Sequence, residues 1–174
     1  MAANKLLDHD GAGRMSNTER VRALRRAGDH EGARSLAIEL LASDSDDFEL
    51  QYEAACVHDY LGREAEAVPF YLAAISGHLS PEQLRSAYLG LGSTYRALGQ
   101  YPSAEHTLRE GLARFPDAWE LKTFLAMSLH NLGKSKQAVE LLLTVLAETT
   151  GDKHVRGYRE AILFYAQDIE RSWP

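Results

Sequence analysis

The sequence predicts an all-α protein, an α-solenoid in which antiparallel helix pairs stack and a last helix caps the C-terminal end. Apolar residues recur at intervals of three and four along most of the chain, which is the period of an amphipathic helix. Four glycines expected between the helices of each pair lie 34, 37 and 34 residues apart: Gly28, Gly62, Gly99 and Gly133. Self-similarity at such a spacing indicates helical repeats.

Length and composition are those of one ordinary globular domain: 174 residues, of which 45% are hydrophobic and 25% charged. The formal net charge of -6 weighs against nucleic acid as a partner, because phosphate-binding domains are usually basic. The single cysteine, Cys56, cannot form an internal disulfide, and the first 14 residues lack the apolar core of a signal peptide, so we expect a cytoplasmic protein. No membrane segment is expected, because the longest apolar run, residues 141–147, is too short to cross a bilayer.

The N-terminal part of the chain predicts a tail and one degenerate repeat. Residues 1–15 show no periodicity and are interpreted as a flexible tail. The repeat spans residues 16–45 and opens with a capping box, in which the Ser16 hydroxyl accepts a backbone N–H and Glu19 reaches back. Its first helix, to about Ala27, has a thin apolar stripe, as expected where a terminal repeat faces solvent.

A second repeat is predicted over residues 46–80. Asp46 or Asp47 caps its first helix, which runs to Leu61. The second helix contains Pro69, and proline inside a helix removes a hydrogen bond, so Pro69 is expected near the first turn. The connection from His78 to Gln83 then contains three additional residues, which explains the longer glycine interval.

The third repeat, residues 81–116, carries the most complete pattern, and Ser80 with Pro81 gives it a clear helix start. Its large and small residues fall at fixed intervals: Tyr88, Leu91, Gly92, Tyr95, Ala104, Leu108 and Pro116. This pattern resembles the tetratricopeptide repeat, W-x2-L-G-x2-Y followed by A-x3-F and P. The resemblance covers about residues 16–150, with Arg20 in the usual large apolar place of the first repeat. The segment LGREAEAVPFY, residues 61–71, is similar to a bacterial tetratricopeptide subgroup of unknown activity.

The C-terminal part predicts one more repeat and a cap. Over residues 117–150, Asp117 is expected to cap the first helix, with Glu120 three residues later, and Ser135 opens the second helix. Ala138, Leu142, Val145 and Leu146 are predicted to form the core face of that second helix. Residues 152–173 place apolar side chains at intervals of three and four, so a lone capping helix is expected.

The resemblance implies a non-catalytic adaptor that binds another protein or a peptide and needs no cofactor. In this family the groove is lined by the first helix of each repeat. In the same register the groove residues of this chain are Glu49, Tyr52, Cys56, Asp59, Ser86, Leu89, Ser93, Arg96, Glu120, Thr123, Met127 and His130. The Lys and Asn residues that clamp a terminal carboxylate in chaperone-binding members are missing from this face. We expect an apolar side chain of the partner against Tyr52 and Leu89, with an acidic group near Arg96.

An alternative function is a structural subunit that forms a homodimer or larger assembly through a terminal helix. Tyr165 and Trp173 lie in the last predicted helix, and exposed aromatic residues are enriched at interfaces. The two functions differ in one measurable property, because self-assembly predicts a stable dimer that is lost when residues 152–174 are removed.

Neither a catalytic nor a metal site is predicted. The seven histidines show no pair four residues apart and no cysteine at zinc-ligand spacing. Cys56 and His58 are two residues apart on a helix and point in different directions, so they do not form a nucleophile and base. Gly90 and Gly92 lie inside a periodic helix and not after a strand, so they do not form a phosphate loop.

Charge is distributed unevenly along the chain. Arginines are concentrated near the N-terminus: Arg14, Arg20, Arg22, Arg25, Arg26 and Arg34. The stretch from Asp44 to Glu66 has eight acidic residues and one base, Arg63. Two interpretations remain open: a solvated terminal cap beside an acidic helix start, or an arginine surface for an acidic partner, which would bind more weakly as salt rises.

Overall fold

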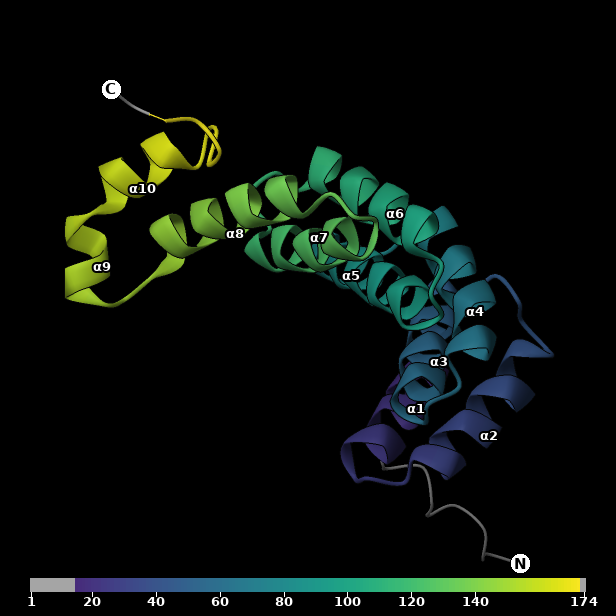
Figure 1. The fold of residues 1–174 in the computed structure, drawn as a ribbon. Helices are drawn as coiled ribbons and strands as arrows, with labels where there is room; N and C mark the ends of the chain where they lie inside the picture. Colours follow the sequence, from purple (N-terminus) through teal and green to yellow (C-terminus); the bar gives the residue numbers. More distant parts are fainter. Residues whose placement is uncertain (1–14, 173–174) are drawn as a thin grey trace, which may run out of the picture.

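The computed structural model describes residues 15–172, which form ten helices and no strand (Figure 1). The helices are α1 Asn17–Arg26, α2 His30–Leu41, α3 Phe48–Tyr60, α4 Glu64–Ser76, α5 Pro81–Ala97, α6 Tyr101–Arg114, α7 Trp119–Asn131, α8 Ser135–Thr149, α9 Lys153–Gly157 and α10 Arg159–Tyr165. The all-α prediction is therefore confirmed. Residues 1–14 of the expected tail, which include Arg14, and Trp173 lie outside the described residues.

The helices pack in sequential order and form a crescent. Each of α1 to α7 contacts the next helix along the chain, and successive members of the series α1, α3, α5 and α7 also contact one another. In Figure 1 these four helices form the inner side of the crescent, and α2, α4 and α6 form the outer side. The predicted stack of antiparallel helix pairs is confirmed.

The four periodic glycines end the first helix of each pair in a left-handed conformation. Gly28, Gly62, Gly99 and Gly133 have φ values of 84°, 69°, 73° and 76°. Glycine adopts this region without the steric cost that a Cβ atom brings, so it reverses the chain directly after a helix. The spacing of these residues therefore reports the period of the fold.

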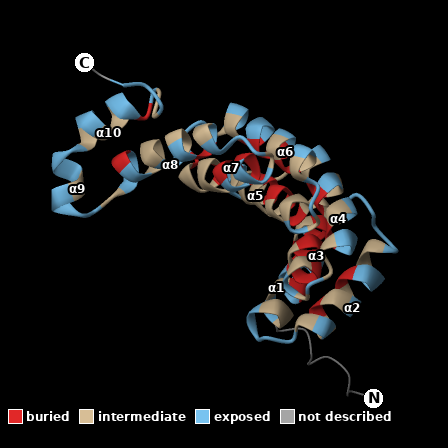
Figure 2. Cartoon of the chain, viewed as in Figure 1, coloured by how far each residue is buried: buried red, intermediate tan, exposed pale blue. Residues whose placement is uncertain are grey.

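A buried layer runs between the inner and outer helices (Figure 2). In the third repeat, Gly92 allows α5 and α6 to approach closely, since a Cβ atom added there would lie 2.5 Å from Cγ of Leu108. Leu108 is fully buried and belongs to a cluster with Tyr88, Leu121 and Leu125. The large and small residues of the repeat pattern thus fill one interface.

Helix starts follow the sequence where a capping side chain is present. Ser16 and Ser80 both form complete capping boxes, with Glu19 and Gln83. Asp47, rather than Asp46, caps α3 by accepting a hydrogen bond from the Leu50 N–H at 2.9 Å.

One predicted helix start was wrong, and Pro69 lies further into its helix than expected. Asp117 does not cap α7, because α7 begins at Trp119 and Ala118 occupies the N-cap position without a side-chain hydrogen bond. Pro69 lies in the second turn of α4, not the first, and the helix continues through it. The carbonyl group that loses its partner belongs to Ala65, an exposed residue, so water can replace the missing donor.

The lone capping helix expected over residues 152–173 was also wrong. The segment forms the short helices α9 and α10, separated at Tyr158 directly after Gly157, and neither helix contains a buried residue. Glycine inside a helix costs about 1 kcal/mol relative to alanine, which explains the position of the break. After the break, α10 packs against α8.

Candidate protein-interaction site

The groove residues predicted on α3 are tied into the packing of three helices. Tyr52, Cys56 and Asp59 are partly buried. Asp59 accepts hydrogen bonds from the Tyr71 hydroxyl of α4 at 3.4 Å and from the Thr94 hydroxyl of α5 at 3.0 Å. These two partners were not identified from the sequence, because Tyr71 was assigned only to the core and Thr94 to no role. The α3 part of the predicted groove therefore already has partners inside the chain, except for exposed Glu49.

Burial changes the acid–base properties of this α3 cluster. It raises the pKa of Tyr52, of the Cys56 thiol and of the Asp59 carboxyl group above their ordinary values. A raised thiol pKa lowers the thiolate fraction at neutral pH, so Cys56 has the character of an inert packed cysteine. The arrangement is one of a structural polar cluster.

On α5 the predicted residues Ser86, Leu89, Ser93 and Arg96 are all partly buried. Leu89 packs against the cluster that contains Leu108, which reduces the apolar surface it can offer a partner. Arg96 differs from the other three, because its Nε atom is buried and has no hydrogen-bond partner. A buried unpaired donor costs about 1 to 3 kcal/mol, so Arg96 can gain from an acceptor supplied by a ligand.

On α7 the predicted residues divide into paired and accessible side chains. Glu120 forms a two-point ion pair with Arg85 of α5. The Thr123 hydroxyl donates to the Trp119 carbonyl group at 2.9 Å, within the same helix. Met127 and His130 are exposed. The accessible end of the predicted groove is therefore the C-terminal half of α7.

A pocket of about 310 Å³ brings Arg96, Met127 and His130 together, from two first helices of the stack. Its other wall is α8, which contributes Ala138, Val139 and Leu142. Among residues 15–172, no carboxylate lines this pocket, although Glu49, Asp59 and Glu120 were expected to surround Arg96. The α8 wall was missed because the family register assigns a groove to first helices alone.

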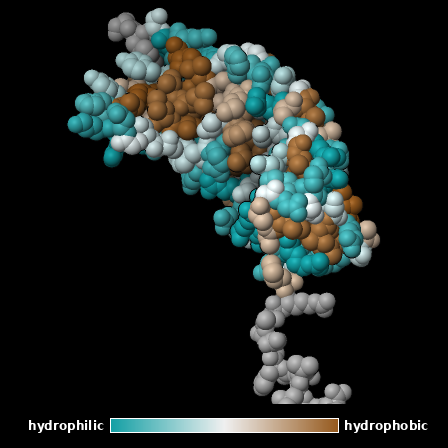
Figure 3. Space-filling model, turned by 90° about the horizontal axis from the view of Figure 1, so that it is seen from below, coloured by the Kyte–Doolittle hydropathy of each residue, from teal (hydrophilic) through white to brown (hydrophobic). Residues whose placement is uncertain are grey.

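The α8 wall continues into an uncovered apolar stripe formed by Val139, Leu142 and Leu146. Their exposed fractions are 42%, 41% and 43%. The prediction that Leu142 and Leu146 belong to a buried core face was therefore wrong. Figure 3 shows hydrophobic side chains gathered in the C-terminal half of the molecule, over the region of α8. We call Val139, Leu142 and Leu146 the α8 stripe.

The arginines near the N-terminus are largely paired inside the chain. Glu53 of α3 is buried and accepts hydrogen bonds from Nε of Arg22 at 2.7 Å and from Nε of Arg25 at 3.0 Å. This ion-pair network joins α1 to α3 and holds the degenerate repeat on the stack. The acidic partner of these two arginines is therefore Glu53, which weakens the interpretation of an open arginine surface.

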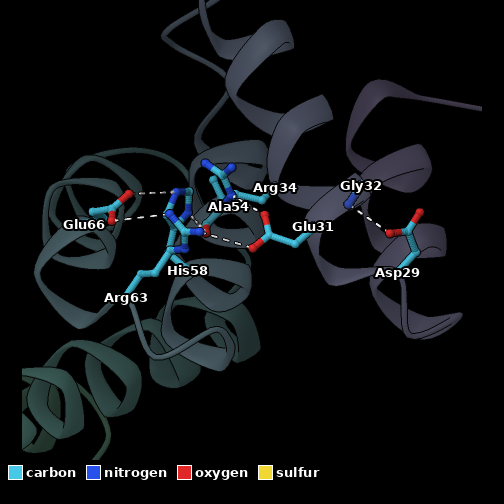
Figure 4. A network of polar contacts seen from close by, with 8 residues as sticks. All are labelled: Asp29, Glu31, Gly32, Arg34, Ala54, His58, Arg63 and Glu66. Carbon is cyan, nitrogen blue, oxygen red and sulfur yellow. Dashed lines mark hydrogen bonds and ion pairs between the residues drawn. The ribbon is translucent and has the colours of Figure 1, made fainter.

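A second network joins α2, α3 and α4 (Figure 4). Glu31 accepts from Arg34 at 2.8 Å and from Arg63 at 3.2 Å. Nearby, His58 is buried, and its Nδ1 lies 2.7 Å from the Ala54 carbonyl oxygen, to which it donates. The polar residues at this end of the stack therefore contact each other across repeats.

The fold and the spacing of its glycines define a helical-repeat protein. A family model described as "Tetratrico peptide repeat" matches residues 48–169, and the chain belongs to the tetratricopeptide repeat family. No curated protein matches the chain.

Solved structures with a similar fold include several of MamA. The structure of MamA from residue 41 to its end, from Desulfovibrio magneticus RS-1, has a TM-score of 0.67 and 18% identity, covering 75% of this chain and 72% of that one. A "MamA RS-1 ArsTM double mutant" has a TM-score of 0.68 and 16% identity, over 83% and 76% of the two chains. A further MamA crystal structure has a TM-score of 0.65 and 17% identity, over 88% and 94%. At these identities the likeness shows the fold alone.

Two properties of residues 15–172 complete the site description. None of their helices is both long and apolar enough to cross a membrane. Within the same residues, no three His, Cys, Asp or Glu side chains are grouped so that they could hold a metal ion.

Proposed function

We propose that this protein is a non-catalytic adaptor that binds another protein on the inner side of its crescent, at the C-terminal end of the predicted groove. The observation that carries the proposal is the pocket between α5, α7 and α8, where apolar side chains lie beside Arg96. Binding sites typically combine an apolar surface with a few fixed polar groups, and here every group lies on a packed helix. Family membership supports the same conclusion, because stacked repeats present extended inner surfaces for binding.

The binding surface in this proposal is smaller than the full twelve-residue groove. Of the twelve predicted residues, those still exposed are Glu49, Met127 and His130, and two more, Leu89 and Arg96, are partly accessible to a partner. A partly buried cysteine with a raised thiol pKa suits a reducing compartment, so we place the adaptor in the bacterial cytoplasm.

Site-specific photo-crosslinking in cells that carry the native gene tests this proposal. A photoreactive phenylalanine replaces Met127, which is exposed in the pocket, or Leu72, which is exposed on α4. We expect a defined crosslinked protein from position 127 that is lost when Arg96→Glu is added, and none from position 72. Crosslinks that form only from position 72 would place binding on the outer side and refute the proposal.

Self-assembly is the second candidate function, because Tyr158 and Tyr165, in the segment of α9 and α10, expose 69% and 51% of their surface. Sedimentation equilibrium of the full chain measures it directly. A concentration-dependent dimer that is lost in a Tyr158→Glu variant would favour self-assembly. A monomer at high protein concentration would exclude it.

A further inference from the structure

Leu142, the central residue of the α8 stripe, occupies a position that is buried in every earlier repeat. Leu142 follows Leu108 by the repeat length of 34 residues, and the equivalent residues in the first two repeats are Ala37 and Tyr71. Their exposed fractions are 0% for Ala37, 3% for Tyr71 and 0% for Leu108, against 41% for Leu142. The difference therefore lies in what covers the position and not in the residue type, since Leu108 and Leu142 are identical.

The missing cover is the first helix of a following repeat. Helices α2, α4 and α6 pack against α3, α5 and α7, respectively, whereas α8 packs mainly against α7 and α10. Leu108 and Leu112 of α6 pack in one cluster with Leu121 of α7. Leu142 and Leu146 are the equivalents of these two α6 residues. The end of the stack thus retains an acceptor surface for one more helix.

Helix α10 does not fill this place. Arg159 binds Glu148 at 2.8 Å, and the Ile169 N–H donates to Glu140 at 3.3 Å, so the segment follows a different side of α8. In the 34-residue register, Arg159 and Glu160 fall at the positions of Leu125 and Ala126, which are buried in α7. Charged residues at these positions cannot enter the interface without losing hydration, which explains why residues 152–172 do not cover the stripe.

We propose that the α8 stripe and the adjoining pocket bind an amphipathic α-helix of a partner protein, which adds to the stack as the first helix of the next repeat. The inference rests on the proposed adaptor function and names the chemistry of the partner. Val139, Leu142 and Leu146 are spaced three and four residues apart, so their side chains form one ridge along α8. The helices that cover the earlier ridges have 13, 17 and 13 residues, which sets the length of the incoming segment.

The partner helix carries an acidic residue on the side that faces Arg96. The pocket next to the stripe contains this arginine, and the described part of the chain supplies neither an acceptor for its buried Nε atom nor a carboxylate in the pocket lining. A carboxylate supplied by the partner pairs with the guanidinium group and satisfies that donor. Apolar residues at intervals of three and four would meet the α8 stripe. This charge match distinguishes the partner helix from the chain's own α10, whose segment pairs with Lys136 and Glu148 on another side of α8.

The test measures binding of designed helical peptides to the full chain by fluorescence anisotropy. The probes are fluorescein-labelled 16-residue helices with a leucine stripe and one Glu, placed at four successive positions of the polar edge, each with a Gln-matched control. A guanidinium group forms a stronger hydrogen bond with a carboxylate than with a neutral amide. We therefore expect one Glu peptide to bind about five- to tenfold more tightly than its Gln control.

Variants of the chain assign the binding to the stripe. Leu142→Asp and Leu146→Asp should each abolish binding, whereas Leu72→Asp, an exposed leucine of α4, should leave it unchanged. Arg96→Gln should make the Glu and Gln peptides bind equally. Circular dichroism melting confirms that each variant is folded, and a variant that unfolds is replaced by the corresponding alanine.

The inference is overturned if no peptide binds, if binding survives both stripe variants, or if a self-association of the chain buries the stripe in sedimentation. Failure of the peptides with retained crosslinking from position 127 removes the partner helix and leaves the adaptor function. Loss of both results removes the adaptor function as well.

Discussion

Leu108 and Leu142 provide an internal comparison, because the same side chain occupies equivalent positions of two successive repeats. Replacing Leu by Ala removes three carbon groups, each worth about 0.8 kcal/mol on full burial, so transfer alone accounts for about 2.4 kcal/mol. At fully buried Leu108 the cavity left behind adds to this loss, and we expect Leu108→Ala to cost about 2 to 5 kcal/mol. Leu142 is 41% exposed, and solvent can enter the vacated space, so Leu142→Ala should cost about 1 to 1.5 kcal/mol.

Urea unfolding followed by circular dichroism measures both costs as shifts of the midpoint at constant slope. The comparison needs no assumption about intrinsic helix propensity, since both substitutions are Leu→Ala inside a helix. Equal losses for the two variants would show that the α8 stripe is covered in solution. A partner helix, if added, should raise the cost of Leu142→Ala and leave that of Leu108→Ala unchanged.

Three further substitutions test the packing and charge networks. Gly92→Leu should destabilise the chain by about 1 to 3 kcal/mol in thermal melting, because its side chain meets Leu108; an unchanged melt would contradict the repeat register. Glu53→Gln should cost about 1 to 3 kcal/mol in urea unfolding, since it weakens the buried acceptor of two arginines, and Glu49→Gln on the exposed face serves as the control. The ion pair with Arg85 lowers the pKa of Glu120 below its usual 4.5, so Glu120 stabilises the fold above that pH and the contribution is lost as pH falls through the lowered folded-state pKa. Glu120→Gln should therefore reduce the loss of stability on acidification, and an unaltered pH profile would show that the pair contributes nothing.

Local chemistry made the architecture predictable from the sequence. Ser80 with Gln83 can close a capping box in only one way, and Gly99 supplies the left-handed residue that ends α5, so the boundaries follow from neighbouring residues. Asp117 failed as a cap because a carboxylate two positions before the first helical residue is one position too early. The position of Pro69 was predicted wrongly because the free-energy cost of a proline inside a helix depends on whether water can reach the carbonyl group that loses its hydrogen bond. The sequence alone does not show that the Ala65 carbonyl group belongs to an exposed residue.

The candidate binding site was harder to predict from the sequence, because the exposure of a side chain depends on which helices pack over it. Leu142 has the same identity and the same helical phase as Leu108, and only the absence of a following first helix exposes it. Tyr52 was expected to anchor a partner, but Tyr71 and Ser86 lie close enough to engage its ring or hydroxyl. Arg96 was singled out from the register of α5, while its buried unpaired Nε became visible only with α7 and α8 in place.

The two ends of the stack differ in a way that determines how a partner can add to it. At the N-terminal end, α1 buries Val21, and two of its arginines form ion pairs with Glu53 of α3. These charged contacts already occupy this end of the stack. At the C-terminal end, the α8 stripe remains exposed beside an arginine that lacks an acceptor. Head-to-tail growth would require α1 to cover the stripe, and its remaining exposed arginines, Arg20 and Arg26, would then face Arg96 or apolar side chains. Like charge and loss of hydration both oppose that contact. A head-to-tail interface that does not close produces filaments, so this mismatch favours the capture of one helix at one end over open-ended assembly.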